Sequence, residues 1–122
     1  PSAPVLAGSL KLDGEPYGVA IRGKFAYVAS GPAGLQVIDI SKPAAPKIIG
    51  SVGVEDFANF VALSGDYAYV SDGNAGVKKI NIANPRAPKL ESAFDTPGES
   101  QGIVLSGQWI LVPDSNSLII LK

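Results

Sequence analysis

The sequence predicts an all-β fold built from three similar units, which we interpret as consecutive blades of a β-propeller. Residues of the same type return at a spacing of 42 along the chain, and each unit contains short runs rich in β-branched and aromatic residues. Four antiparallel strands per unit of roughly 40 to 45 residues are typical of a propeller blade. Two columns show the spacing: Gly23, Gly65 and Gly107, and Val28, Val70 and Val112.

The repeat divides a single domain, residues 1–122, into units of about 4–45, 46–87 and 88–122. Ala-Pro pairs mark the boundaries of the units, and a chain of this length is normally one domain. Its apolar content of 46% is enough for a globular core. The third unit differs at its last turn, 114–117, which is one residue shorter than its counterparts.

The second unit shows every element of a four-stranded antiparallel blade. Ser64-Gly65-Asp66 predicts a tight hairpin, since glycine takes a positive φ without steric strain. Pro85 and Pro88 predict a stiff corner, because proline cannot donate a hydrogen bond to a strand ladder. No apolar pattern at helical spacing persists long enough to predict a helix. The predicted strands of this unit are 47–52, 60–63, 67–71 and 77–82.

A β-trefoil is also built from three units of similar length, so it is the alternative fold at this level. Residues 35–39, Leu-Gln-Val-Ile-Asp, favour the propeller because they resemble the motif that names the LVIVD repeat family. The resemblance covers the whole chain and includes 26–30 and 68–73, although the later copies depart from the motif at 77–81 and 118–121. It implies bacterial or archaeal propeller repeats, mostly from exported or cell-surface proteins, and thus a scaffold rather than a particular reaction.

The order of strands predicts an open assembly. With strands named a to d from the ring axis to the rim, the chain begins on a strand d near 5–12 and continues with blades at about 18–53 and 60–95. It ends with strands a, b and c at about 102–122. Three blades are too few to close a ring, and their open edges and apolar faces invite association. We therefore expect a homodimer that forms a six-bladed ring; further blades of a longer chain, or a filament, would satisfy the same edges.

The residue inventory argues against catalysis. The chain contains no histidine and no cysteine, so the usual general base, the thiol nucleophile and the best zinc ligands are missing. We expect no enzyme, no catalytic, cofactor-binding or metal residues, and no cofactor. Calcium is the ion that acidic loops could hold, but residues 72–76 lack the alternating ligands of a calcium loop. A net charge of −1 gives no reason to expect nucleic acid, and no apolar run approaches the roughly 18 residues of a membrane span.

Charge placement predicts two different faces. Because strands alternate in direction, the d–a and b–c loops lie on one face and the a–b and c–d turns on the other. The first face is acidic and could attract cations or a basic partner, although solubility is the simpler explanation. The candidate partner face consists of Glu15, Glu55, Asp56, Phe57, Asn59, Asp72, Glu99 and Asp114. The opposite face collects Arg22, Lys24, Lys42, Lys47, Arg86 and Lys89.

These features predict a non-catalytic interaction or scaffold module that binds a protein partner and completes its ring by dimerisation or within a larger propeller. The family resemblance and the missing initiating methionine indicate a secreted or cell-surface protein. The alternative is a carbohydrate- or cation-binding propeller, in which Tyr17, Phe57 and Trp109 could stack on the rings of a glycan.

Overall fold

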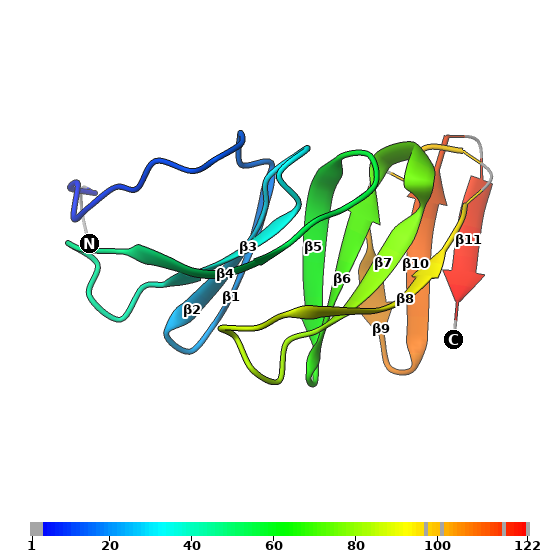
Figure 1. Ribbon diagram of the computed structural model, residues 1–122. Helices are drawn as coiled ribbons and strands as arrows, with labels where there is room; N and C mark the ends of the chain where they lie inside the picture. Colours follow the sequence, from blue (N-terminus) through cyan, green and yellow to red (C-terminus); the bar gives the residue numbers. More distant parts are fainter. Residues whose placement is uncertain (1–3, 97, 101, 116, 122) are drawn as a thin grey trace.

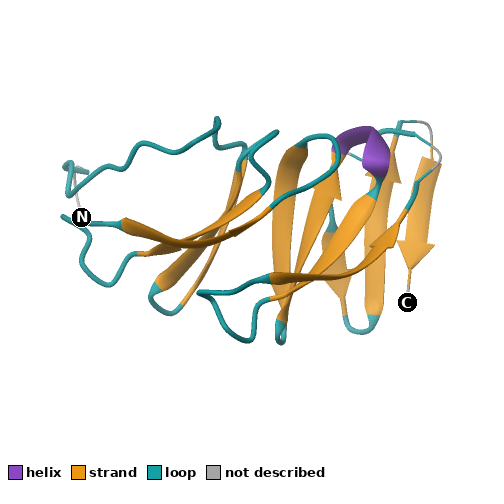
Figure 2. Cartoon of the chain, viewed as in Figure 1, coloured by secondary structure: helices purple, strands orange, loops and turns teal. Residues whose placement is uncertain are grey.

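The structure, a computed structural model, describes residues 4–96, 98–100, 102–115 and 117–121. In this part of the chain the strands form three antiparallel sheets, which follow one another along the sequence and lie side by side (Figure 1). Apart from a single short 3-10 turn, the described regular structure is all strand (Figure 2). The predicted all-β class is therefore confirmed.

Sheet 1 is a four-stranded meander of β1 (Gly18–Arg22), β2 (Phe25–Ala29), β3 (Leu35–Asp39) and β4 (Lys47–Val52). Neighbouring strands along the chain are neighbours in the sheet, as expected when short turns join antiparallel strands. The two middle strands are the most buried, and the ladder between β3 and β4 shifts register in mid-strand. Strand β4 forms one edge of this sheet.

Sheet 2 repeats this order with β5 (Ala58–Ser64), β6 (Tyr67–Asp72), β7 (Val77–Asn81) and β8 (Lys89–Phe94). The same register shift recurs between its third and fourth strands, so the two sheets share this irregularity as well as their strand order. The 3-10 turn η1 (Gly73–Ala75) joins β6 to β7, within residues 72–76, which lie between two predicted strands.

Sheet 3 contains β9 (Val104–Ser106), β10 (Trp109–Asp114) and β11 (Ser117–Leu121), with β10 in the middle. These strands match a, b and c of the other sheets, as the strand phase along the sequence predicts. Among the described residues, no strand pairs with the outer edge of β11. This sheet therefore ends on an open ladder of backbone donors and acceptors.

Glycine turns join the first two strands of each sheet. Gly23, Gly65 and Gly107 have φ angles of 60°, 57° and 60°. Such left-handed backbone carries no steric cost in glycine, and a glycine at the first position of a two-residue turn suits the twist of a hairpin. Turn geometry thus explains the repeated glycine column.

The main core lies between sheets 1 and 2. Tyr27, Leu35 and Val37 of sheet 1 belong to one buried cluster with Val70 and Ile80 of sheet 2. Alternation along each strand puts these side chains on the two facing sides, so the sheets stack face to face. Burial of such a cluster is the main source of stability for a small all-β unit.

The junction between sheets 2 and 3 is less completely filled. Val77, Ile103 and Val112 form a buried cluster there. Lys79 stands at the position that Val37 occupies in the first unit, and its Nζ lies 4.1 Å from the ring centre of Tyr67. A cleft of about 570 Å³ opens at this junction. The change from an aliphatic to a long cationic side chain is consistent with this looser contact.

The segment before β1 differs from the prediction. No described residue before Gly18 belongs to a strand, so the expected strand near 5–12 is not formed. The physical reason is that a strand requires a pairing partner, and none of the described sheets pairs with this segment. Its path is nevertheless that of a strand d, because Gly8 lies against Pro43 as Gly50 of β4 lies against Pro85.

Backbone contacts near one end of the sheets hold neighbouring units together. Gly31 pairs with Ala58 across the first junction, and the amide of Ser100 donates to the carbonyl of Gly73 across the second, at 3.0 Å. The described strands form no closed barrel, which a trefoil would need. Three stacked antiparallel sheets are consistent with successive propeller blades.

Candidate functional site

The loops that the sequence assigns to one face lie together at one end of the sheets. The turns after β2, β4 and β6 are at the upper end in Figure 1, where η1 is drawn in Figure 2. We call this end the acidic loop face. It consists of residues 13–17, 30–34, 53–59, 72–76, 95–96, 98–100 and 114–115.

Asp72, at the end of β6, is fully buried beneath this face. Its carboxylate accepts hydrogen bonds from the backbone amides of Glu55, Asp56 and Phe57, at 3.0, 3.0 and 2.8 Å. Hydrogen bonds to an ionised acceptor are stronger than neutral ones. Asp72 therefore holds the loop between β4 and β5 in place, and its carboxylate points into the protein rather than towards a partner.

Lys78 on β7 supplies the countercharge. Its buried Nζ lies 3.0 Å from Asp72 Oδ2 and 3.3 Å from Glu55 Oε1, and it donates to the carbonyl of Ala75 at 2.9 Å. Burial opposes the charge of the ammonium group, but the hydrogen bonds and the attraction of Asp72 and Glu55 outweigh it and raise the pKa of Lys78. Sequence reasoning missed this residue because it belongs to a strand and not to a loop.

We call the buried site of Asp72 and Lys78 the buried corner. The first unit has the same corner without a buried ion pair. Ser30 replaces the aspartate, and its hydroxyl donates to Gln36 Oε1 at 2.9 Å. Gln36 stands at the position of Lys78, and its amide donates to Asp13 at 3.5 Å. Both Ser30 and Gln36 are buried. A neutral pair thus occupies the place of the charged pair in unit two.

Asp114 occupies the same corner in the third unit. Its carboxylate accepts from the amides of Gly98 at 2.8 Å and Ser115 at 2.6 Å, and Ser115 Oγ accepts from the amide of Glu99 at 3.2 Å. Ile119 stands in the lysine column, so no cation comes from that position. Asp72 and Asp114 share one role, which is to fix the loop that leads from the preceding sheet into their own sheet.

An aromatic pair lies on the acidic loop face where sheets 1 and 2 meet. Tyr17 and Phe57 contact each other edge to face, with ring centres 4.8 Å apart. The hydroxyl of Tyr17 donates to Glu15 at 3.1 Å, and this hydrogen bond raises the pKa of Tyr17. Gly31 lies beneath both rings, where a Cβ atom would come within about 3.2 Å of each. Half of Tyr17 is exposed, so the pair offers an apolar surface beside carboxylates.

The remaining candidates divide between the surface and the second junction. Glu15, Glu55, Asp56 and Glu99 are exposed on the acidic loop face. Asn59 instead faces sheet 3, where its Nδ2 donates to the carbonyl of Ser100 at 3.3 Å. Its Oδ1 is buried and has no hydrogen-bond partner among the described residues. The surface available to a partner is therefore smaller than the predicted set.

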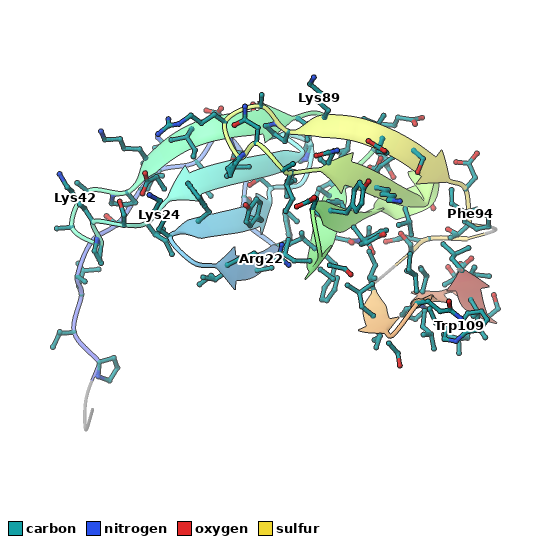
Figure 3. All side chains as sticks on the ribbon, turned by 90° about the horizontal axis from the view of Figure 1, so that it is seen from below. Arg22, Lys24, Lys42, Lys89, Phe94 and Trp109 are labelled. Carbon is teal, nitrogen blue, oxygen red and sulfur yellow. The ribbon has the colours of Figure 1, made fainter. Side chains whose placement is uncertain are left out.

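The a–b and c–d turns lie at the opposite end, which Figure 3 views directly and on which it labels Arg22, Lys24, Lys42 and Lys89. Arg22 donates to the carbonyl of Gly65, which ties the first turn of sheet 1 to that of sheet 2. Most of the basic side chains thus gather at this end, together with the carboxylates of Asp39 and Asp66.

The cleft at the second junction carries aromatic side chains. Tyr69 and Phe94 of sheet 2 and Trp109 of sheet 3 line it together with Lys79. Phe94 and Trp109 are both partly exposed, and Figure 3 shows them at the end of β8 and on sheet 3. An aromatic cleft with a polar rim is suited to small ligands.

Within the described ranges, no three Asp or Glu side chains converge as a metal site. No helix in the same ranges has the length and apolar character needed to cross a membrane.

Comparison with protein-family models gives three matches to the LVIVD repeat, at residues 13–54, 57–96 and 97–121. The first match contains all four strands of sheet 1, the second all four strands of sheet 2, and the third the strands of sheet 3. A search of curated proteins gave no match.

Proposed function

Because the chain belongs to the LVIVD repeat family, we propose that it is a non-catalytic β-propeller module that binds a protein partner on its acidic loop face. The observation that carries this proposal is the aromatic pair of a half-exposed Tyr17 and a partly buried Phe57 beside carboxylates. Asp72 of the buried ion pair beneath it accepts a hydrogen bond from the amide of Phe57 at 2.8 Å. Rigid aromatic side chains on a fixed loop are typical of protein contact sites.

The partner that fits this surface is a basic protein segment. Glu15, Glu55 and Asp56 are exposed around the rings, so a Lys or Arg side chain could pair with a carboxylate and lie against an aromatic ring. Salt screens such contacts, since the Debye length falls from about 30 Å at 0.01 M to about 3 Å at 1 M ionic strength. Binding of this kind should weaken as salt is raised.

The test measures binding of a lysine- and arginine-rich peptide by fluorescence anisotropy at low and high salt. Glu15→Lys should weaken binding and reduce its salt dependence. Glu91→Lys is the matched control, because it makes the same change at an exposed position on β8, away from the face. Binding that ignores salt, or equal losses in both variants, would show that the acidic loop face is not the contact.

A carbohydrate-binding propeller is the second candidate, and the cleft at the second junction favours it. Trp109, Phe94 and Tyr69 offer aromatic surface for a sugar ring. A ligand that binds only the native state raises the melting temperature, so glycans at millimolar concentration should do so for the native chain and not for Trp109→Ala. No shift with a panel of glycans would remove this candidate.

We also propose that the module completes its ring by dimerisation or with further blades of the same family, and that it acts outside the cell or at its surface. The first part is supported by the open edge of β11 and by residues 5–12, which pair with none of the described strands. Fractionation of cells that make the protein tests the second, since recovery from the cytosol alone would contradict it.

A further inference from the structure

The outer faces of sheets 1 and 3 resemble the two faces that meet at the junction between sheets 1 and 2. At the first junction, Leu35 and Val37 face Val61, Val70 and Ile80 of the next sheet. Leu118 and Ile120 are the equivalents of Leu35 and Val37 in sheet 3. They lie on its open face and are 56% and 58% exposed. The open face of sheet 1 carries Val19, Val28 and Ile38, which are the repeat equivalents of those three residues of sheet 2.

Part of the open face of sheet 1 is already covered and part is not. Leu12 packs against the cluster of Ala26, Val28 and Ile38. Val19 and Ile21 on the same sheet remain 61% and 63% exposed. Exposed apolar surface of this kind on a sheet face is typical of an interaction site.

We propose that a second copy of the chain docks head to tail, so that residues 5–12 of one copy pair with β11 of the other as the fourth strand of sheet 3. The inference rests on the proposed function in one respect, because it takes the sheets to be propeller blades. The occupant is a second copy because residues 5–12 carry the apolar positions of β4 and β8, and because the open face of sheet 1 matches the face that sheet 2 presents to sheet 1.

The repeat predicts the register of this pairing. In sheet 1, Leu35 pairs with Val52, and in sheet 2 the equivalent residues Val77 and Phe94 pair. The same columns place Leu118 opposite Leu10 of the second copy. They also place Leu121 opposite Leu6, as Ile38 lies opposite Ile48 and Ile80 lies opposite Leu90.

Two copies that are related by a two-fold axis can make this head-to-tail contact twice and so form a closed ring. Each copy then gives one segment and receives one, and the two sets of three sheets make six. A ring of six lies within the range of four to eight blades that closed propellers have. Closure removes both open edges, which is one of the ways in which antiparallel folds avoid aggregation.

The first experiment is the mass in solution by sedimentation at micromolar concentration. The native chain should be a dimer, and Ile120→Asp should raise its dissociation constant roughly 10- to 100-fold, the factor for exposing one aliphatic side chain. Leu90→Asp is the matched control, because Leu90 is equally exposed on a rim strand outside the contact. A stable monomer, or equal dissociation of both variants, would overturn the proposal.

The second experiment tests the register through disulfide cross-links in this cysteine-free chain. Leu10→Cys with Leu118→Cys should give a covalent dimer on mild oxidation, since directly opposed residues have Cα atoms about 4.5 to 5.5 Å apart. Leu6→Cys with Leu118→Cys should not, because Leu6 lies opposite Leu121, and three residues along β11 place the Cα atoms of Leu6 and Leu118 about 10 Å apart. Equal cross-linking of both pairs would rule out the register.

Peptide binding separates this inference from the proposed function. A monomeric chain that still binds the basic peptide in a salt-dependent way would overturn the dimer and leave the function standing. A cross-linked dimer that ignores the peptide would support the dimer and count against the function.

Discussion

Substitution of Asp72 by asparagine tests the role of the buried corner most directly. The change preserves shape but puts an amide group where one carboxylate oxygen was. Oδ1 accepts from the amides of Asp56 and Phe57, and Oδ2 accepts from the amide of Glu55 and from Lys78. An asparagine can keep an oxygen at only one of these places. Its NH₂ group would then face an N–H or ammonium donor at the other.

The expected cost follows from the charge left behind. Removing one partner of a buried ion pair costs about 3 to 5 kcal/mol, because the remaining charge has lost its compensation. Glu55 cannot replace Asp72 fully, since its side chain is 73% exposed and water screens it. A loss of this size is a large part of the roughly 5 to 15 kcal/mol that stabilises a domain. It corresponds to a fall in melting temperature of about 12 to 20 °C.

Urea denaturation followed by tryptophan fluorescence measures the effect. The midpoint should fall while the slope stays constant, which would show a change in stability rather than in compactness. Asp66→Asn is the matched control, because Asp66 is exposed in a turn and its loss should change stability by less than about 0.5 kcal/mol.

A double variant separates the charge from the shape. Asp72→Ser with Lys78→Gln reproduces the neutral pair that Ser30 and Gln36 form in the first unit. It should lose less stability than Asp72→Asn alone, because no buried charge is left without a partner. If Asp72→Asn costs less than about 1 kcal/mol, or if the double variant is the less stable of the two, the corner does not depend on its ion pair and the reasoning is wrong.

Three further outcomes can be measured by the same denaturation assay. Ser71→Ala should stabilise by about 1 kcal/mol, because the buried Ser71 Oγ has no hydrogen-bond partner among the described residues. Gly50→Ala should destabilise by about 1 to 3 kcal/mol, since its Cβ would lie 2.6 Å from the carbonyl oxygen of Pro85, whereas Gly53→Ala has free space and should be neutral. The pKa of Lys78 is raised in the folded state, so its charge stabilises the fold fully at pH values below the unfolded-state pKa of about 10.4. This stabilisation is lost as pH rises through the folded-state pKa. Native chain and Lys78→Met should therefore converge in stability above pH 10.4, and a constant difference would contradict the linkage.

Local chemistry determined the parts of the fold that the sequence could predict. The column of Gly23, Gly65 and Gly107 indicates hairpins because only glycine takes left-handed backbone without cost, and each of these turns is present. Alternation and β-branched residues indicate the strands for the same kind of local reason. The segment near 5–12 has the strand pattern but no strand, because pairing depends on a second chain segment and not on its own residues.

The acidic loop face shows where sequence alone was insufficient. Counting charges in loops predicted that Asp72 faces a partner, but its backbone contacts turn it inwards and Lys78 reaches it from a neighbouring strand. The contact of Tyr17 with Phe57 joins two residues that are 40 positions apart in the chain. The repeat, its turns and its strand order were thus determined by the sequence. The direction of each carboxylate and the position of the aromatic pair depend on how the sheets stack, because hydrogen bonds and packing act between residues that the sequence does not place together.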